Sequence, residues 1–214
     1  MIIIHSCGVI ANGATGAVYK GLAAGVNPSG VFLYATNFRC GTIDVFDSKF
    51  KPAKLKGHFE DSKIPAGYAP FGIANIDGDL VVTYAAQDKD KHDDNAGPGR
   101  GFVDIFDTDG NLIKRFASYT VLNSPWGIAQ APFNFGRFSN DLLIGNFGDG
   151  RISAFKLDGQ FDGRLLNTSG QLVQIDGLWS LIFGGGSQSS PSTLYFTAGP
   201  NHEADGLFGT LTPQ

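Results

Sequence analysis

Short apolar runs, each bounded by glycine, aspartate or asparagine, recur along the whole chain. They are rich in aliphatic, aromatic and β-branched side chains, which is typical of buried strands. These runs are residues 32–38, 80–84, 142–147 and 194–197. Behind three of them comes a segment in which apolar and polar residues alternate with a period of two, as in a strand with one buried face. The alternating segments are residues 42–47, 102–107 and 151–155. The pattern predicts an all-β protein.

A four-residue motif returns once in front of each apolar run. It combines glycine or serine with a following leucine or isoleucine, and its copies are residues 20–23, 71–74, 126–129 and 179–182. Counted from Gly21 to Gly72, Gly127 and Ser180, the steps are 51, 55 and 53 residues. A period of this length with strand and turn signals indicates the blades of a β-propeller. We expect residues 1–214 to form a single β-propeller domain.

The repeats predict where each blade begins and ends. They cover approximately residues 17–60, 68–119, 123–176 and 177–213. We expect four antiparallel strands in the first three repeats and three strands in the last one, whose final strand is residues 206–211. An apolar N-terminal strand, residues 2–10, could complete that last blade and close a four-bladed ring. The alternative is an open arc of blades with an unpaired edge.

Composition and charge narrow the function classes. The chain has 30 glycines, 18 phenylalanines and 17% charged residues, which suits an all-β domain with many turns. Its formal net charge is −4, so we expect no nucleic-acid partner. No apolar run approaches the roughly 20 residues that span a bilayer, and the N-terminus lacks the basic start of a signal peptide. Cys7 and Cys40 could form one disulfide, although unpaired thiols are the default expectation.

Several separate motifs, in a fixed order, carry a resemblance to a known family. They are residues 17–22, 33–38, 65–71, 90–94, 123–127, 145–150 and 195–201. Over residues 14–213 the chain resembles an uncharacterised, usually secreted β-propeller family related to NHL-repeat proteins. The resemblance implies a six-bladed propeller of which this chain matches the carboxy-terminal two-thirds, and an extracellular location. It favours the open arc or a shortened ring over a deliberately closed ring of four.

Function in a propeller usually resides in loops gathered on one face around the axis. The loop at residues 87–101 is long and polar, and residues 199–205 occupy the same place two repeats later. Asn37 and Asn146 stand at equivalent points in the other two repeats. The predicted binding-face residues are Asn37, Asp88, Asp90, His92, Asp93, Asp94, Asn146, Asn201, His202, Glu203 and Asp205.

Two interpretations of this face remain open. Carboxylate and amide oxygens suit Ca²⁺ or Mg²⁺, whereas added histidines suit Zn²⁺. The residues of this face favour Ca²⁺ or Mg²⁺ over Zn²⁺. The candidate metal ligands are His92, Asp93, His202, Glu203 and Asp205. The simpler interpretation is a solvated loop in which Asn37 and Asn146 cap turns. We expect Trp126 and Trp179 to be core residues between blades.

Two functions of different classes follow. The first is a binding or interaction scaffold that uses the loop face to hold a protein, a glycan or a small molecule; the lack of a recognisable nucleophile and base favours this non-catalytic role. The second is a metal-dependent hydrolase or lyase of the propeller-lactonase kind, with a divalent ion polarising a carbonyl near the central channel. A propeller fold by itself decides neither.

Overall fold

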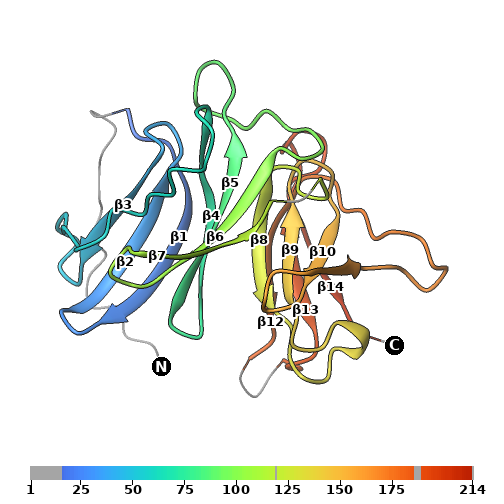
Figure 1. Ribbon diagram of the computed structural model, residues 1–214. Helices are drawn as coiled ribbons and strands as arrows, with labels where there is room; N and C mark the ends of the chain where they lie inside the picture. The colour runs from blue at the N-terminus through green and yellow to red at the C-terminus, as the bar shows by residue number, and fades with distance from the viewer. Residues whose placement is uncertain (1–15, 119, 186–188, 214) are drawn as a thin grey trace.

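The computed structural model describes residues 16–118, 120–185 and 189–213, and in them the chain folds into four small antiparallel sheets (Figure 1). The first sheet contains β1 (Tyr19–Asn27), β2 (Gly30–Asn37) and β3 (Thr42–Asp47). The second contains β4 (Tyr68–Ile76), β5 (Asp79–Ala86), β6 (Gly101–Phe106) and β7 (Leu112–Ala117). The third contains β8 (Pro125–Gln130), β9 (Leu142–Asn146), β10 (Ile152–Phe155) and β11 (Phe161–Arg164). The fourth contains β12 (Leu178–Phe183), β13 (Leu194–Ala198) and β14 (Leu207–Leu211).

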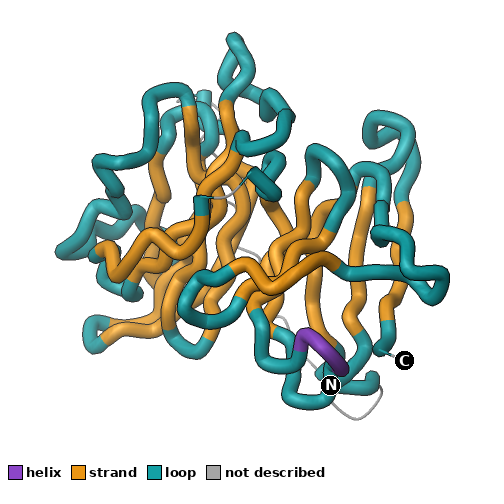
Figure 2. Tube along the Cα trace, turned by 45° about the vertical axis from the view of Figure 1, so that its right-hand side comes forward, coloured by secondary structure: helices purple, strands orange, loops and turns teal. Residues whose placement is uncertain are grey.

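The four sheets are consecutive propeller blades, which confirms the predicted fold class. In each blade the strands pair in chain order, with the motif strand at one edge. The motif strands contact one another in sequence, β1 with β4, β4 with β8, and β8 with β12. Figure 2 shows the sheets side by side, with the connecting loops gathered at the two ends of the strands. We number the blades one to four in chain order.

Burial along each strand follows from its place in this stack. From Leu80 to Ala85 every residue of β5 is buried, because blades lie against both faces of that sheet. In β1, buried and exposed positions alternate, since only one face of blade 1 meets another blade. Two-sided packing therefore explains the continuous burial of β5, and one-sided packing explains the alternating burial of β1.

The hydrophobic cores lie between neighbouring blades. Between blades 1 and 2, Tyr34 and Ile43 pack against Ile73, Val82 and Phe106. Equivalent positions form the cores between blades 2 and 3 and between blades 3 and 4. Burying these side chains stabilises the stack by roughly 25 cal/mol per Å² of apolar surface removed from water.

One prediction about the strands is wrong. Blade 1 has three strands among the described residues, not four, because the chain after β3 makes only an isolated bridge between Phe46 and Pro52. It then crosses to blade 2, where the backbone N–H of Gly57 donates to the carbonyl of Asp109. Phe59 fills the crevice between the two blades, with its ring 5.7 Å from Tyr34 and 5.5 Å from Phe106. Packing of Phe59 thus replaces a fourth strand.

Two further predictions, the N-terminal strand and the disulfide, involve residues that the structure does not describe. Residues 2–10 lie outside the described part, so their pairing with the last blade stays a prediction. The same holds for the disulfide, because Cys7 lies outside it, while Cys40 is exposed. Within the described part of the chain, no helix has the length and apolar character needed to cross a membrane.

Candidate functional site

A β-bulge in each motif strand aims one side chain at the axis. The pairing register of every motif strand shifts at the motif, between Tyr19 and Leu22 in β1, and at the same place in β4, β8 and β12. A bulge redirects a side chain that regular alternation would place on a sheet face. The residues next to these bulges are Lys20, Phe71, Trp126 and Trp179.

Glycine at the next position lets neighbouring motif strands approach closely. A Cβ on Gly72 would lie 2.2 Å from the carbonyl oxygen of Trp126, and one on Gly127 would lie 2.7 Å from that of Trp179. Neither distance is sterically allowed, so only glycine fits there. The repeated glycine therefore brings the axial side chains together.

Three of those side chains join two further phenylalanines in an aromatic cluster at the loop end of the axis, which we call the axial cluster: Phe38, Phe71, Trp126, Phe147 and Trp179. Trp179 lies at the centre, with its ring centroid 4.5 Å from Phe147, 5.2 Å from Trp126 and 6.1 Å from Phe71. Phe38 and Phe71 are buried, but Phe147 and both tryptophans are only partly buried. Both tryptophans are in a core, as predicted, but at the axis and with part of each ring accessible.

Blade 1 places a cation beside the cluster, where the other blades have an aromatic ring. The Lys20 ammonium lies 5.9 Å from the centre of the Phe38 ring and 2.9 Å from a carboxylate oxygen of Asp93. Asp93 also accepts a 3.0 Å contact from Nδ1 of His92. Hydrogen bonds from Lys20 and then His92 lower the pKa of Asp93 below its usual range. Asp93 therefore stays ionised and holds the long loop of blade 2 against blade 1.

The remaining predicted residues of this loop have structural or exposed positions. Asp88 Oδ1 accepts the backbone N–H of His92 at 2.9 Å, which closes a local turn. Burial raises the pKa of Asp94, a half-buried residue, whereas Asp90 is exposed. The loop is thus ordered by its own hydrogen bonds.

The corresponding loop of blade 4 has an unusual backbone. Asn201, His202 and Glu203 all have positive φ, at 56°, 56° and 63°. The Asn201 side chain donates a 2.5 Å hydrogen bond to Asp205, and its backbone N–H bonds to the carboxylate of Asp176. Non-glycine residues in this region carry strain, which is concentrated at functional sites in many proteins.

Asn37 and Asn146 cap turns at the ends of β2 and β9. Asn146 donates hydrogen bonds to the Val121 carbonyl at 2.8 Å and to Asp149 at 3.1 Å. Asn37 donates to Asp44 at 3.1 Å. Their side chains are buried and engaged in shaping the loops, which agrees with the simpler sequence interpretation.

The candidate metal ligands do not meet in one cluster. The structure joins His92 to Asp93, but among the described residues no three His, Cys, Asp or Glu side chains gather as a ligand set. His202, Glu203 and Asp205 are exposed on the loop of blade 4. Whether the chain binds a divalent ion stays a prediction.

A cavity of about 360 Å³ adjoins the axial cluster between blades 3 and 4. Phe147 forms one wall, and the carboxylates of Asp149 and Asp176 provide polar groups. Asp149 is held by the Asn146 amide and by Arg151, whose guanidinium lies 3.7 Å away. With one aromatic wall, two carboxylates and three glycines, this cavity is a small polar recess beside the axial cluster.

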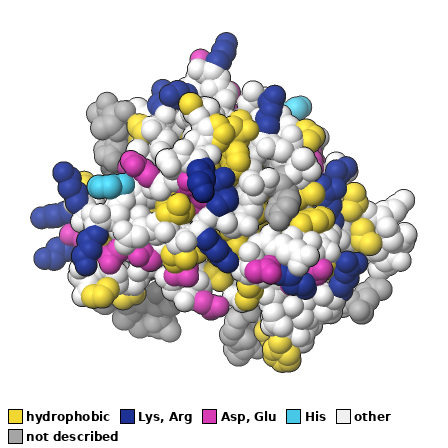
Figure 3. Space-filling view, in the orientation of Figure 1, with side chains coloured by type: hydrophobic (Ala, Val, Ile, Leu, Met, Phe, Trp, Pro, Cys, Tyr) yellow, Lys and Arg dark blue, Asp and Glu magenta, His cyan; other side chains and the backbone are white. Residues whose placement is uncertain are grey.

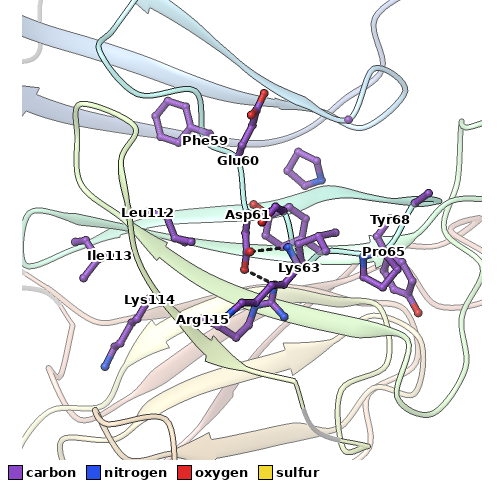
Figure 4. Close-up of a pocket in the computed structure, with 16 residues that line it drawn as sticks. Phe59, Glu60, Asp61, Lys63, Pro65, Tyr68, Leu112, Ile113, Lys114 and Arg115 are labelled. Carbon is purple, nitrogen blue, oxygen red and sulfur yellow. Dashed lines mark hydrogen bonds and ion pairs between the residues drawn. The ribbon is translucent and has the colours of Figure 1, made fainter.

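A larger cavity, about 780 Å³, lies away from the axis beside the outer strand of blade 2 (Figure 4). There the Arg115 guanidinium bridges two buried carboxylates, Asp61 and Asp104. Burial raises the pKa of Asp104 to about 6, although its bond to Arg115 acts in the opposite direction. Burial also raises the pKa of Tyr84, which lines the same cavity. Sequence analysis missed this network because Asp61 lies in an irregular segment and Asp104 alternates in a strand like any polar residue.

The face of the molecule seen in Figure 3 has no single dominant charge. Figure 3 shows Lys and Arg side chains interspersed with Asp and Glu across one face, with small apolar areas between them.

The chain is similar in sequence to uncharacterized viral proteins. No family model matches the chain. It is 38% and 36% identical to two uncharacterized proteins of Acanthamoeba polyphaga mimivirus, over 91% and 97% of this chain and over 48% and 55% of theirs. The chain thus spans about half the length of the curated relatives it matches.

Among solved structures, a protein of unknown function from Bacteroides thetaiotaomicron is similar, with a TM-score of 0.57 and 9% identity. The match covers 92% of this chain and 48% of that one. A gluconolactonase from Xanthomonas campestris has a TM-score of 0.49 and 15% identity, over 92% of this chain and 86% of the other.

Proposed function

We propose that this protein is a non-catalytic binding scaffold whose loop face holds a partner over the axial cluster. The observation that carries the proposal is the set of partly accessible rings of Trp126, Phe147 and Trp179 at the loop end of the axis. Accessible aromatic side chains at the centre of a surface are enriched at binding sites because they bury a large area with little loss of conformational entropy.

Polar groups around the cluster would orient the partner. Lys20 and Asp93 lie on one side, and Asp149 and Asp176 line the cavity on the other. Apolar rings with a few fixed polar groups fit the flat C–H face and the hydroxyls of a sugar ring. An oligosaccharide is therefore the partner we propose to test first, ahead of a protein or a small metabolite.

The chain offers a direct reporter of this site. Its only two tryptophans, Trp126 and Trp179, both belong to the axial cluster. A partner that stacks there will change the intrinsic tryptophan fluorescence. We expect a glycan array to identify bound oligosaccharides, and titration with each of them to give a saturable fluorescence change.

Two variants test the location. Trp179→Ala removes the central ring and is expected to weaken binding by at least tenfold, which is about 1.4 kcal/mol. Phe133→Ala changes a ring that is 81% exposed in the loop between β8 and β9, and binding is expected to stay the same. An array and a pull-down that both find no partner, or equal effects of the two substitutions, would reject the proposal.

The alternative, a metal-dependent lactonase-like hydrolase or lyase, makes a different prediction. It requires a stoichiometric divalent ion in the purified protein and a fall in melting temperature with EDTA. Metal analysis combined with a thermal scan separates it from the scaffold.

A further inference from the structure

The hairpin that follows β11 contains the sequence Asn-Thr-Ser, which is a sequon for N-linked glycosylation. A sequon is an asparagine followed two positions later by serine or threonine, with any residue except proline between them. Asn167, Thr168 and Ser169 meet this rule, and no other asparagine of the chain does. In blade 3, β11 is the strand farthest from the motif strand β8, so this hairpin is separate from the axial cluster.

The whole hairpin lies on the surface. Every residue from 166 to 172 is exposed. An isolated bridge between Leu166 and Leu172 closes the hairpin, and the backbone N–H of Asn167 donates to the Gln171 carbonyl at 2.7 Å. Exposed loop tips are where enzymes reach a folded chain most readily. The structure therefore presents Asn167 on a defined turn that is open to a modifying enzyme.

The carboxamide of Asn167 is held by its oxygen and leaves its nitrogen free. Oδ1 accepts the backbone N–H groups of Ser169 and Gln171, both at 3.0 Å. Two N–H donors require an acceptor, so they identify this atom as the oxygen and place Nδ2 on the other arm of the carboxamide. Among the described residues, neither Nδ2 nor the exposed Ser169 hydroxyl has a hydrogen-bond partner. Both groups that a sequon requires are thus available.

Asn27 shows how the fold can block a similar turn. Its Oδ1 accepts the backbone N–H of Ser29 at 2.7 Å, so this turn begins with the same hydrogen bond as the one at Asn167. However, Asn27 is only 8% exposed, and its Nδ2 donates to the Asp109 carboxylate at 2.8 Å. Pro28 also stands at the position from which a sequon excludes proline. Exposure and a free amide nitrogen therefore distinguish Asn167 from Asn27.

We propose that Asn167 is the acceptor for an N-linked oligosaccharide, transferred from a polyprenyl diphosphate donor by an oligosaccharyltransferase. Nδ2 forms a bond to the anomeric carbon of the first sugar and loses one proton. The bond between that carbon and the diphosphate oxygen breaks, and the polyprenyl diphosphate leaves with the electron pair. The product carries a bulky, solvated glycan on the outer hairpin of blade 3. This site is independent of the partner proposed for the axial cluster.

The purified, folded chain tests the proposal when it is incubated with an oligosaccharyltransferase and a polyprenyl diphosphate oligosaccharide. We expect the intact mass to rise by one oligosaccharide, peptide mapping to place it on Asn167, and peptide N-glycosidase to remove it. Asn167→Gln removes the acceptor and Ser169→Ala removes the hydroxyl, and each is expected to abolish the transfer. Thr168→Ala changes the middle position, where a sequon accepts alanine, so it is the matched control and is expected to keep the wild-type yield.

Pro28→Ala separates the effect of the fold from that of the sequon. The substitution completes a sequon at Asn27 but leaves that side chain buried and bonded to Asp109. The folded variant is therefore expected to accept one oligosaccharide, on Asn167, and not two. A wild-type chain that gains no mass overturns the proposal, and so does transfer to Ser169→Ala at the wild-type yield. Loss of transfer in Thr168→Ala, or a second oligosaccharide on Pro28→Ala, overturns the claim that the fold selects Asn167.

Discussion

The hydroxyl of Thr36 in blade 1 donates a 2.8 Å hydrogen bond to the backbone carbonyl of Phe71 in blade 2. The same hydroxyl oxygen accepts the backbone N–H of Gly21 at 2.6 Å. All three groups are buried. The Thr36 hydroxyl therefore provides a hydrogen-bond partner for the Gly21 N–H in the bulge of its own blade and links that blade to the Phe71 carbonyl of the next.

Thr36→Val tests this link. The substitution keeps the shape of the side chain but leaves the Gly21 N–H and the Phe71 carbonyl without this partner. We expect a loss of about 1 to 3 kcal/mol in the free energy of unfolding, measured by urea denaturation. Thr197 holds the equivalent place in blade 4 but is exposed, so Thr197→Val is expected to change stability by less than about 0.5 kcal/mol. Equal losses in the two variants would contradict the role given to Thr36.

Gly72→Ala tests the close approach of the motif strands. The added Cβ would fall 2.2 Å from the carbonyl oxygen of Trp126, so blades 2 and 3 must separate. We expect a loss of roughly 1 to 3 kcal/mol and a changed tryptophan emission spectrum. Ser180 occupies the same place in blade 4, where a side chain is already tolerated, and Ser180→Ala is expected to be nearly neutral. An unchanged melting temperature for Gly72→Ala would show that the strands can move apart at little cost.

Arg115→Leu tests the ionic network beside the outer cavity. The change leaves the buried carboxylates of Asp61 and Asp104 without their cation. Loss of one partner from a buried ion pair costs about 3 to 5 kcal/mol, and we expect a loss of that order at pH 7. The exposed Lys49→Leu serves as the control, with little expected change. A loss below about 1 kcal/mol would mean that water or another group compensates both carboxylates.

The raised pKa of Asp104 predicts a dependence of stability on pH. The folded protein keeps this proton up to about pH 6, whereas the unfolded chain releases it near its ordinary value of 3.8. The stabilisation from this carboxyl is therefore present at low pH and is lost as the pH rises from about 4 through 6. Asp104→Asn removes the titration, so its stability relative to the wild type is expected to rise by roughly 2 to 3 kcal/mol over that interval. Parallel stability curves for the two proteins would refute the assignment.

Tyr84→Phe is expected to be neutral or slightly stabilising. The Tyr84 hydroxyl is buried and has no hydrogen-bond partner among the described residues. Removing an unsatisfied buried hydroxyl relieves a desolvation cost of the order of 1 kcal/mol. Thermal unfolding of the variant measures this directly. A clear loss of stability would indicate that a bound water or ligand engages the hydroxyl.

Much of the fold follows from local pattern. The apolar runs of blades 2 and 3 became buried middle strands because blades pack on both of their faces, and each motif became an edge strand with a bulge. The missing fourth strand of blade 1 was not predictable, because Phe59 finds its place between Tyr34 and Phe106 only after both blades exist. The sequence predicted binding loops at residues 87–101 and 199–205, but nothing in it indicated that Lys20 would reach Asp93 across 73 positions.

The sequence by itself determined the repeat and the all-β class, because both depend on the periodicity of side chains along the chain. The tertiary structure decided which repeated positions stay exposed and which join a site. Leu22 and Ile73 are alike in the sequence, yet only Ile73 is covered, because blade 1 lies in front of it. Burial depends on what packs against a face, and that neighbour is specified by the assembled stack of blades.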